Sequence, residues 1–486
     1  MMATMTGRTT WIAVLAALAL AVSAAPGAGA EKPNIVFILA DDLGWSDVGF
    51  NGADFYETPN IDRLARQGMI FTSAYTGGPN CSPTRACLMT GTYTPRHHIW
   101  TPGGGAKGDV RRMKLKVPVQ MPFFKRSGVE PWPPNFETTN ELDPAFVSIA
   151  EVLKTAGYVS GRFGKWHLGP DTQGFDYSTL GAADDGKKRY YDDPDATERL
   201  TTAALEFMEK HRDRPFFVYL PYWDVHGPLV AHQDVVEKYK AKLARLEPDR
   251  DYNPVYAAMI EAVDTGVGRV MAKLAELKLE RNTLVIFSSD NGGVSSVTYN
   301  DPLRAGKGSL FEGGIRVATC MRWPAVIKPG TRCDTPITSV DFLPTFAEIA
   351  GAALPESQPV DGKSFLPLLR GERALEDRAI FWHYPLYLSG SNRTNFIPFP
   401  GGRPGEGPGW RTTPVSAIRQ GDWKLLEFFE DGHVELYNLR EDIGERNNLA
   451  EKTPEKAREL LEKLHAWQRA VGAPIPREKN PAYRGT

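Results

Sequence analysis

Short apolar runs alternate with helical segments from Asn34 to about residue 350. This alternation predicts an α/β domain with a large, mostly parallel (mixed) β-sheet flanked by helices. Ile35–Leu39 is a continuous apolar run, which is typical of a strand covered on both faces. A short helix is expected from Thr58, because Thr is a favoured N-cap residue and Pro59 suits the first helical position. A long amphipathic helix is predicted by the helical spacing of Tyr256, Ile260, Val263, Val267, Val270, Leu274 and Leu277.

Three further apolar runs are expected to be strands, and each leads directly into a polar cluster. The runs are Tyr158–Phe163, Phe216–Leu220 and Thr283–Phe287, and the clusters that follow them are residues 164–169, 224–228 and 289–293. The first strand likewise ends at the pair Asp41 and Asp42. In open α/β sheets, ligands bind beyond the carboxyl ends of the strands. The four polar clusters are therefore expected to converge on one pocket.

The pattern changes after residue 351. Short runs at residues 379–384, 416–418, 423–428 and 433–437 predict antiparallel strands, with Asp431 and Gly432 as a hairpin turn. A helix is expected at Pro454–Val471. Residues 31–351 are thus expected to form the α/β domain, and residues 352–486 a smaller C-terminal α+β domain with a short antiparallel sheet. Two stretches, residues 101–137 and 389–414, show no sustained helical or strand periodicity of apolar residues. They are expected to be long loops or insertions.

Residues 1–30 have the pattern of a secretory signal peptide. Arg8 supplies the positive start, Trp11–Ala25 the apolar segment, and Ala28-Gly29-Ala30 the cleavage site. An uncleaved membrane anchor is the alternative, but the apolar segment is shorter than the roughly 20 residues that a spanning helix needs. We therefore expect a secreted or periplasmic bacterial protein without a stable membrane anchor.

Composition and charge narrow the possible partners. With 42% hydrophobic and 24% charged residues, the chain is expected to be a soluble globular protein. The net charge of −2 argues against nucleic acid or an anionic membrane as a partner. The four cysteines do not define a pairing, because Cys320 and Cys333 could form a disulfide or could equally be small buried apolar residues.

Oxygen-bearing side chains follow two of the expected strands, namely Asp41, Asp42, Asp290 and Asn291. A site that offers only oxygen ligands suits a hard cation such as Ca²⁺ or Mg²⁺, whereas zinc would require histidine or thiolate. An Asp-Asp pair after a strand can also cap a helix in a solvated turn. The second oxygen-bearing pair at a distant strand end favours the metal site.

Cys81 stands just before Pro83, at the start of an expected helix, where the helix dipole favours attack on an anion. A plain thiolate nucleophile is one interpretation, because helix N-termini lower the pKa of a thiol. The run Cys81-Ser82-Pro83-Thr84-Arg85 with a downstream Thr-Gly pair instead resembles the signature of the formylglycine-dependent (type I) sulfatase family of the alkaline-phosphatase-like superfamily. The resemblance extends from Lys32 to Leu439 and covers nearly the whole chain after the leader.

This resemblance implies a cofactor and a modification. A formylglycine-generating maturation enzyme would oxidise Cys81 to Cα-formylglycine, whose aldehyde hydrate would be the nucleophile. One calcium ion would be bound by the side chains of Asp41, Asp42, modified Cys81, Asp290 and Asn291.

The resemblance also implies the catalytic residues. Arg85 would hold the modified side chain, and Lys165 and Lys307 would bind the sulfate, where cations stabilise the charge of the transition state. His226 would protonate the leaving alcohol, and His167 would take the proton whose loss releases sulfate. The alternatives are a surface position for Arg85 and structural roles for the two histidines.

The substrate is defined least by the sequence. Arg96, His97, His98 and His383 resemble positions that face the substrate in carbohydrate sulfatases. Trp100, Trp132 and Trp410 lie in or beside the two long loops and could stack on sugars or pack locally. The resemblance implies an arylsulfatase-like enzyme that removes sulfate from galactose or N-acetylgalactosamine glycans or from aryl sulfates. A phosphate or phosphonate ester hydrolase of the same superfamily and a non-catalytic glycan-binding protein are the alternatives.

Overall fold

The computed structural model describes Met1 and residues 32–181, 190–246, 250–390, 397–398 and 409–485. Apart from Met1, the expected signal peptide lies outside the described residues. Among the described residues, no helix is both long and apolar enough to cross a membrane.

An eight-stranded sheet forms the centre of the fold, in the order β5-β4-β6-β1-β7-β8-β2-β9. Its five strands from β5 to β7 are parallel, whereas β8 runs antiparallel to both of its neighbours, so the sheet is mostly parallel and mixed, as the sequence predicts. The strands are β1 Asn34–Ala40, β2 Met69–Phe71, β4 Val159–Phe163, β5 Tyr177–Thr179, β6 Phe216–Pro221, β7 Thr283–Ser289, β8 Thr319–Arg322 and β9 Thr331–Cys333.

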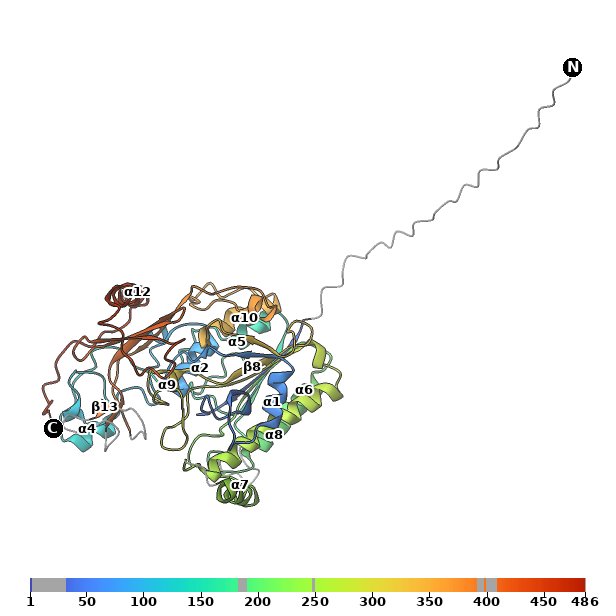
Figure 1. Ribbon diagram of the computed structural model, residues 1–486, viewed down its shortest axis with the longest axis horizontal. Helices are drawn as coiled ribbons and strands as arrows, with labels where there is room; N and C mark the ends of the chain where they lie inside the picture. The colour runs from blue at the N-terminus through green and yellow to red at the C-terminus, as the bar shows by residue number, and fades with distance from the viewer. Residues whose placement is uncertain (2–31, 182–189, 247–249, 391–396, 399–408, 486) are drawn as a thin grey trace. The chain divides into compact units, whose positions relative to one another are not determined.

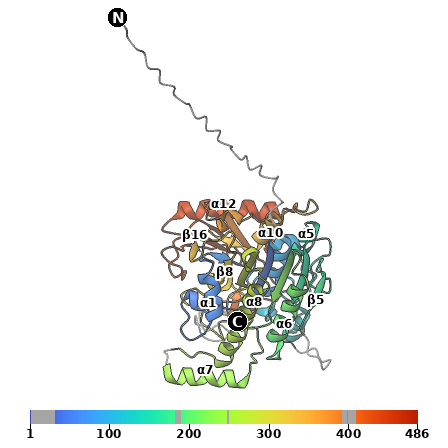
Figure 2. The ribbon, with the colours of Figure 1, turned by 90° about the vertical axis from the view of Figure 1, so that its right-hand side faces the viewer.

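Helices cover both faces of this sheet (Figures 1 and 2). Alternate residues of β1 point to opposite faces, so Val36 and Ile38 join one apolar core and Ile35 and Phe37 the other. All seven residues of β1 are buried, which confirms the prediction of a doubly covered strand. The first face is covered by α1 Pro59–Arg66, α6 Ala196–Lys210, α7 Gln233–Leu246 and α8 Pro254–Glu276, and the second by α2 Cys81–Thr90, α5 Ile149–Thr155, α10 Phe342–Ala350 and α11 Leu366–Leu369.

Two helix predictions can be checked in detail. Helix α8 buries the predicted apolar residues up to Leu274, and it ends at Glu276, so Leu277 is the C-cap. Helix α1 begins at Pro59, as predicted, but the Thr58 side chain makes no capping bond. Its hydroxyl instead accepts a hydrogen bond from the backbone N–H of Gly49 at 2.8 Å.

The C-terminal part contains a four-stranded antiparallel sheet in the order β11-β15-β16-β17. The strands are β11 Ala379–Tyr384, β15 Val415–Gln420, β16 Trp423–Phe428 and β17 Val434–Asn438, and helix α12 Pro454–Val471 packs on them. The predicted strands and helix are confirmed, with β15 longer than expected. The predicted boundary between residues 351 and 352 stays a prediction.

The two stretches expected to be loops carry some regular structure. The first contains a short 3₁₀ helix, Val110–Arg112, and helix α4 Met121–Ser127. The second contributes to a three-stranded sheet in the order β12-β14-β13, formed by β12 Leu388–Gly390, β13 Ile397–Pro398 and β14 Gly409–Thr412. Residues 391–396 and 399–408 lie outside the described part.

A buried charge cluster joins the C-terminal sheet to the main domain. Lys424 on β16 places its Nζ 2.9 Å from Glu312 Oε1 and 2.8 Å from Glu445 Oε1, and all three side chains are fully buried. Glu312 begins the short helix α9 Glu312–Ile315, which follows the loop that carries Lys307. All four cysteines are free thiols, so Cys320 and Cys333 do not form a disulfide.

Candidate active site

The carboxyl ends of β1 and β7 lie side by side, because the two strands pair in parallel along their whole length. The residues that follow them, Asp41 and Asp42 after β1 and Asp290 and Asn291 after β7, therefore meet as the sequence predicts. Asn291 Nδ2 donates to Asp42 Oδ1 at 2.8 Å, and the backbone N–H of Asp42 donates to Asp290 Oδ1 at 3.3 Å. All four side chains are buried, so this is not a solvated turn.

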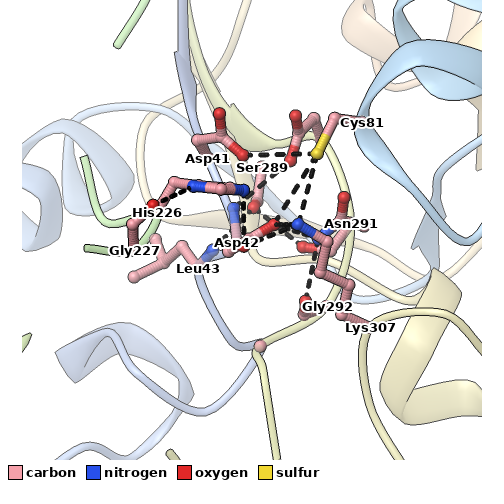
Figure 3. A network of polar contacts seen from close by, with 12 residues as sticks. Asp41, Asp42, Leu43, Cys81, His226, Gly227, Ser289, Asn291, Gly292 and Lys307 are labelled. Atoms are coloured by element: carbon pink, nitrogen blue, oxygen red, sulfur yellow. Dashed lines mark hydrogen bonds and ion pairs between the residues drawn. The ribbon is translucent and has the colours of Figure 1, made fainter. Parts of the chain in front are cut away.

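Cys81 is the first residue of α2, and its side chain points at these carboxylates (Figure 3). Its Sγ lies 3.5 Å from Asp41 Oδ1 and 3.9 Å from Asp42 Oδ1, and Lys307 Nζ donates to it at 3.3 Å. Burial and the Asp41 carboxylate raise the pKa of the Cys81 thiol to about 12. With these protein groups around it, the Cys81 thiol stays protonated at neutral pH. This argues against a thiolate as the nucleophile.

Three cations face the carboxylates. Arg85, one turn after Cys81 on α2, is fully buried, and its Nε and Nη2 donate to Asp290 Oδ2 at 3.0 and 2.7 Å. A surface position for Arg85 is therefore excluded. Lys165, just after β4, contacts Asp41 through its Nζ, and its backbone carbonyl accepts from Arg85 Nη1 at 2.7 Å. Lys307 places its Nζ 2.6 Å from Asp42 Oδ1.

The cations around Asp41 decide its charge state. Burial alone would raise the pKa of Asp41, but Lys165, His226 and Arg85 outweigh burial and hold the pKa well below its ordinary value. Burial opposes the charged form of Lys165, yet the Asp41 carboxylate raises its pKa above the ordinary range. Asp41 and Lys165 are therefore both charged at neutral pH.

The two candidate histidines lie at this site in different settings. His226, after β6, donates from Nδ1 to the Gly227 carbonyl at 2.6 Å, and its Nε2 lies 3.7 Å from Asp42 Oδ2. Its side chain is 29% exposed. His167 is more enclosed, and its Nδ1 is buried without a hydrogen-bond partner among the described residues. Burial and the nearby charge of Lys165 lower the pKa of His167 to about 3, so its imidazole is neutral at pH 7.

The arrangement can hold a metal ion. Asp41, Asp42, Cys81 and His226 each offer a ligand atom, and these four atoms all lie within 4.8 Å of one another. Asn291 Oδ1 is buried and has no hydrogen-bond partner among the described residues. A buried amide oxygen that accepts no hydrogen bond is a ligand that a hard cation can satisfy.

The predicted substrate residues occupy several different settings. Arg96 is bound by Asp361, with its Nη2 2.8 Å from Asp361 Oδ1. His98 Nδ1 lies 2.6 Å from Glu137 Oε2. Both line a hollow of about 860 Å³ together with residues 134–139. They remain candidates for substrate contact.

His97 and His383 are buried, and both ring nitrogens of each contact other protein groups. His97 Nε2 lies 3.4 Å from Cys87 Sγ, and its Nδ1 accepts from a backbone N–H. His383 bonds through Nδ1 to Ser416 Oγ at 2.6 Å and through Nε2 to the Pro474 carbonyl at 3.0 Å. Neither ring has a nitrogen left for a ligand, so this geometry argues against a substrate contact by His97 or by His383.

The three tryptophans considered for sugar stacking also have structural contacts. Trp100 is fully buried and donates to the Glu137 carbonyl at 3.0 Å, and Trp410 is buried against Tyr387. Trp132 packs edge-on against Phe124, with 5.0 Å between the ring centroids, and is only partly buried. Local packing explains Trp100 and Trp410.

The structure also adds residues to the site that the sequence did not indicate. The rings of Tyr191 and Trp223 lie 5.8 and 5.9 Å from Lys165 Nζ, and Tyr191 also approaches His226. Trp223 could have been found, since it directly precedes the polar cluster after β6. Lys107 and Arg411 lie in the two long stretches, where no motif marks them.

Comparison with known proteins identifies the family. A profile of the sulfatase family matches residues 33–352. A sulfatase of Formosa agariphila is 34% identical over 91% of this chain and 90% of its own, and an N-acetylgalactosamine-6-O-sulfatase of Bacteroides thetaiotaomicron is 28% identical over 90% and 94%. The solved structure of Ps i-CgsB with k-i-k-neocarrahexaose matches with a TM-score of 0.70 at 27% identity, covering 91% of this chain and 98% of that one. The chain belongs to the sulfatase family and is a sulfuric ester hydrolase of alkaline-phosphatase-like fold.

Proposed function

We propose that this sulfatase hydrolyses sulfate esters of a carbohydrate by means of a formylglycine at position 81 and one calcium ion. The observation that carries the proposal is the position of Cys81, which begins α2 and faces Asp41, Asp42 and Lys307 within 3.9 Å. A buried thiol with a raised pKa is a poor nucleophile. An aldehyde hydrate at this position supplies a hydroxyl nucleophile and a second hydroxyl through which the sulfate can be released.

The residues fit a calcium ion. Asp41, Asp42, Asp290 and Asn291 offer hard oxygen ligands, and the buried Asn291 Oδ1 lacks any other partner among the described residues. Bound there, calcium supplies positive charge that polarises the nucleophile and the sulfate oxygens. A thiol ligand would suit a softer metal, so an oxygen ligand derived from Cys81 agrees better with the other four.

The charges of the site suit a sulfate anion. Three carboxylates, Asp41, Asp42 and Asp290, are matched by Arg85, Lys165 and Lys307, so these side chains are formally neutral together. A divalent cation would leave an excess of two positive charges, which favours the binding of an anionic substrate. Lys165 and Lys307 would then bind the terminal oxygens, where charge in the transition state is stabilised most.

Proton transfer is assigned to the two histidines. Because Nδ1 of His226 donates to the Gly227 carbonyl, Nε2 is the nitrogen that can give a proton to the leaving alcohol. The partial exposure of His226 places it where a bulky leaving group has access. Burial and the charge of Lys165 lower the pKa of His167, so its imidazole is neutral at pH 7, which is the protonation state that a proton acceptor needs.

The substrate proposal is a sulfated galactose or N-acetylgalactosamine glycan. It is supported by the names of two similar proteins, an N-acetylgalactosamine-6-O-sulfatase and Ps i-CgsB, which was solved with a neocarrahexaose. The leader-like residues 1–30 support export to a compartment in which such glycans are degraded. A maturation enzyme that acts on Cys81 is the protein partner that this proposal requires.

The proposal is tested by sulfate release from a panel of position-defined sulfated sugars and an aryl sulfate, with an aryl phosphate alongside. We expect the wild type to cleave the sulfates and Cys81→Ser to be nearly inactive. Cys333→Ser, a change at a free cysteine on the edge strand β9, is the matched control and is expected to keep its activity. Much faster turnover of the phosphate, or full activity of Cys81→Ser, would overturn the proposal.

A further inference from the structure

Two cations outside the sulfatase motif lie next to the catalytic residues. Lys107 belongs to the stretch before α4, and Arg411 lies on β14. Both residues are attached to strand β12. The backbone of Lys107 pairs with Leu388 on one edge of β12, and strand β14, which carries Arg411, pairs with the other edge. The two side chains are therefore held by the same small sheet, although about 300 positions separate them in the sequence.

This small sheet packs against the loop that carries Lys307. A Cβ placed on Gly308 would lie 2.7 Å from Leu388 Cδ2 and 3.1 Å from Arg411 Cδ, so the Arg411 stem lies against the residue next to Lys307. The backbone N–H of Gly308 in turn donates to the Pro79 carbonyl at 2.9 Å, two residues before Cys81. Burial lowers the pKa of Lys107, as does repulsion by the like charges of Lys307 and Arg411, which lie close to it, and the Asp42 carboxylate attracts the Arg411 guanidinium.

Lys107 and Arg411 differ from the other cations of the site in having no counterion. Arg85, Lys165 and Lys307 each contact a carboxylate. In the part of the chain that the structure describes, no acceptor or carboxylate contacts the Lys107 ammonium or the Arg411 guanidinium, and Arg411 Nε is buried without a partner. Lys107 and Arg411 are both half-buried. A cation in such a setting is stabilised when an anion binds beside it.

A single sulfate ester does not meet this requirement. It carries one negative charge, and Lys165, Lys307 and a bound divalent cation already surround its place beside Cys81. Lys107 and Arg411 add two positive charges that no described carboxylate contacts directly. A ligand that neutralises them must bring a second negative charge on the side of β12 and β14.

We propose that Lys107 and Arg411 bind a second anionic group of the substrate, a sulfate or a uronate carboxylate on the reacting sugar or its neighbour. The guanidinium and the ammonium together offer several donors to the oxygens of such a group. This assignment rests on the proposed sulfatase function, because it places the second anion relative to the sulfate that is cleaved.

Binding to the full-length Cys81→Ala variant, loaded with calcium, tests the assignment without turnover. Calorimetry compares N-acetylgalactosamine 6-sulfate, the same sugar with a second sulfate, and the monosulfated sugar linked to a uronate. A second anion is expected to strengthen binding about tenfold, which corresponds to about 1.4 kcal/mol. The sugar that shows the gain identifies the anion as sulfate or carboxylate.

Arg411→Gln and Lys107→Gln are each expected to reduce this gain to less than about threefold, which corresponds to about 0.65 kcal/mol. Arg411→Lys is expected to restore part of it. Arg373→Gln, at an arginine whose side chain is 87% exposed, is the matched control and should keep the full gain. Melting temperatures check that each variant is folded, and Lys107→Gln provides an independent test if Arg411→Gln is unstable.

Two results would overturn the assignment: an absence of any gain from a second anion, or an equal loss of affinity for singly and doubly charged sugars in both glutamine variants. The second result would place both cations at the reacting sulfate. Sulfate release by the unmutated protein is measured separately. Release without a gain refutes only the second anion site, whereas failure to release sulfate from any ester refutes the proposed function.

Discussion

Replacing His226 by alanine tests whether this side chain protonates the leaving alcohol. Its Nε2 faces the site, 3.7 Å from Asp42 Oδ2, because Nδ1 is bonded to the Gly227 carbonyl. A positioned general acid contributes about 10² to 10⁴ in rate, which is about 2.7 to 5.4 kcal/mol. A sugar alcohol leaves poorly without a proton, whereas nitrophenolate leaves as the anion. We expect His226→Ala to lower kcat by about 10³ for a sugar sulfate and by about tenfold or less for nitrophenyl sulfate.

The assay is kcat for a series of sulfate esters whose leaving groups differ in pKa. In the variant, log kcat should fall more steeply with the leaving-group pKa than in the wild type, because the proton donor is missing. His232→Ala is the matched control, since His232 is 52% exposed and pairs with Asp195 at the surface. An equal loss for every leaving group, or a change in KM alone, would refute the role of His226 as the acid.

Three further predictions concern the metal and stability. Calcium removal by a chelator should lower both the activity and the melting temperature, and adding calcium back should restore both. If neither quantity changes, the metal site is excluded. Lys424→Met should lower the free energy of unfolding by about 3 to 5 kcal/mol in urea titrations at pH 8. The loss should be smaller at pH 5.5, because burial raises the pKa of Glu445 to about 7 and this partner of Lys424 is then neutral. A loss below about 1 kcal/mol at pH 8 would contradict the prediction. Burial lowers the pKa of His97 and His383 to about 3, so the stability that each neutral ring contributes is complete above pH 6.5 and is lost toward pH 3. Replacing both by glutamine should flatten this decline, and an unchanged pH profile would contradict the reasoning.

The core of the site could be predicted because it depends on strand ends. Parallel strands bring their carboxyl ends to one edge, so polar residues after β1, β4, β6 and β7 had to meet there. The helix beginning at Cys81 was also predictable from Pro83. These short-range signals placed Asp41, Arg85, Lys165 and His226 within one contact network.

The surroundings of the site could not be predicted in the same way. His383 was expected to face the substrate, but it lies within the sheet formed by β11 and β15, and the chain after α12 covers it. Lys107 and Arg411 reach the site only because β12 and β14 pair within a stretch that shows no regular pattern. Such positions depend on tertiary pairing, which leaves no local signal in the sequence.

The central claim is that Cys81 becomes formylglycine in the active enzyme. Mass spectrometry of the peptide that contains Cys81, from protein produced with and without a formylglycine-generating enzyme, tests this claim most directly when sulfate release is measured on the same samples. We predict that the mass of the thiol-to-aldehyde conversion appears only with that enzyme and that activity rises in proportion to the converted fraction. Full sulfatase activity in protein whose Cys81 is an unmodified thiol would contradict the account.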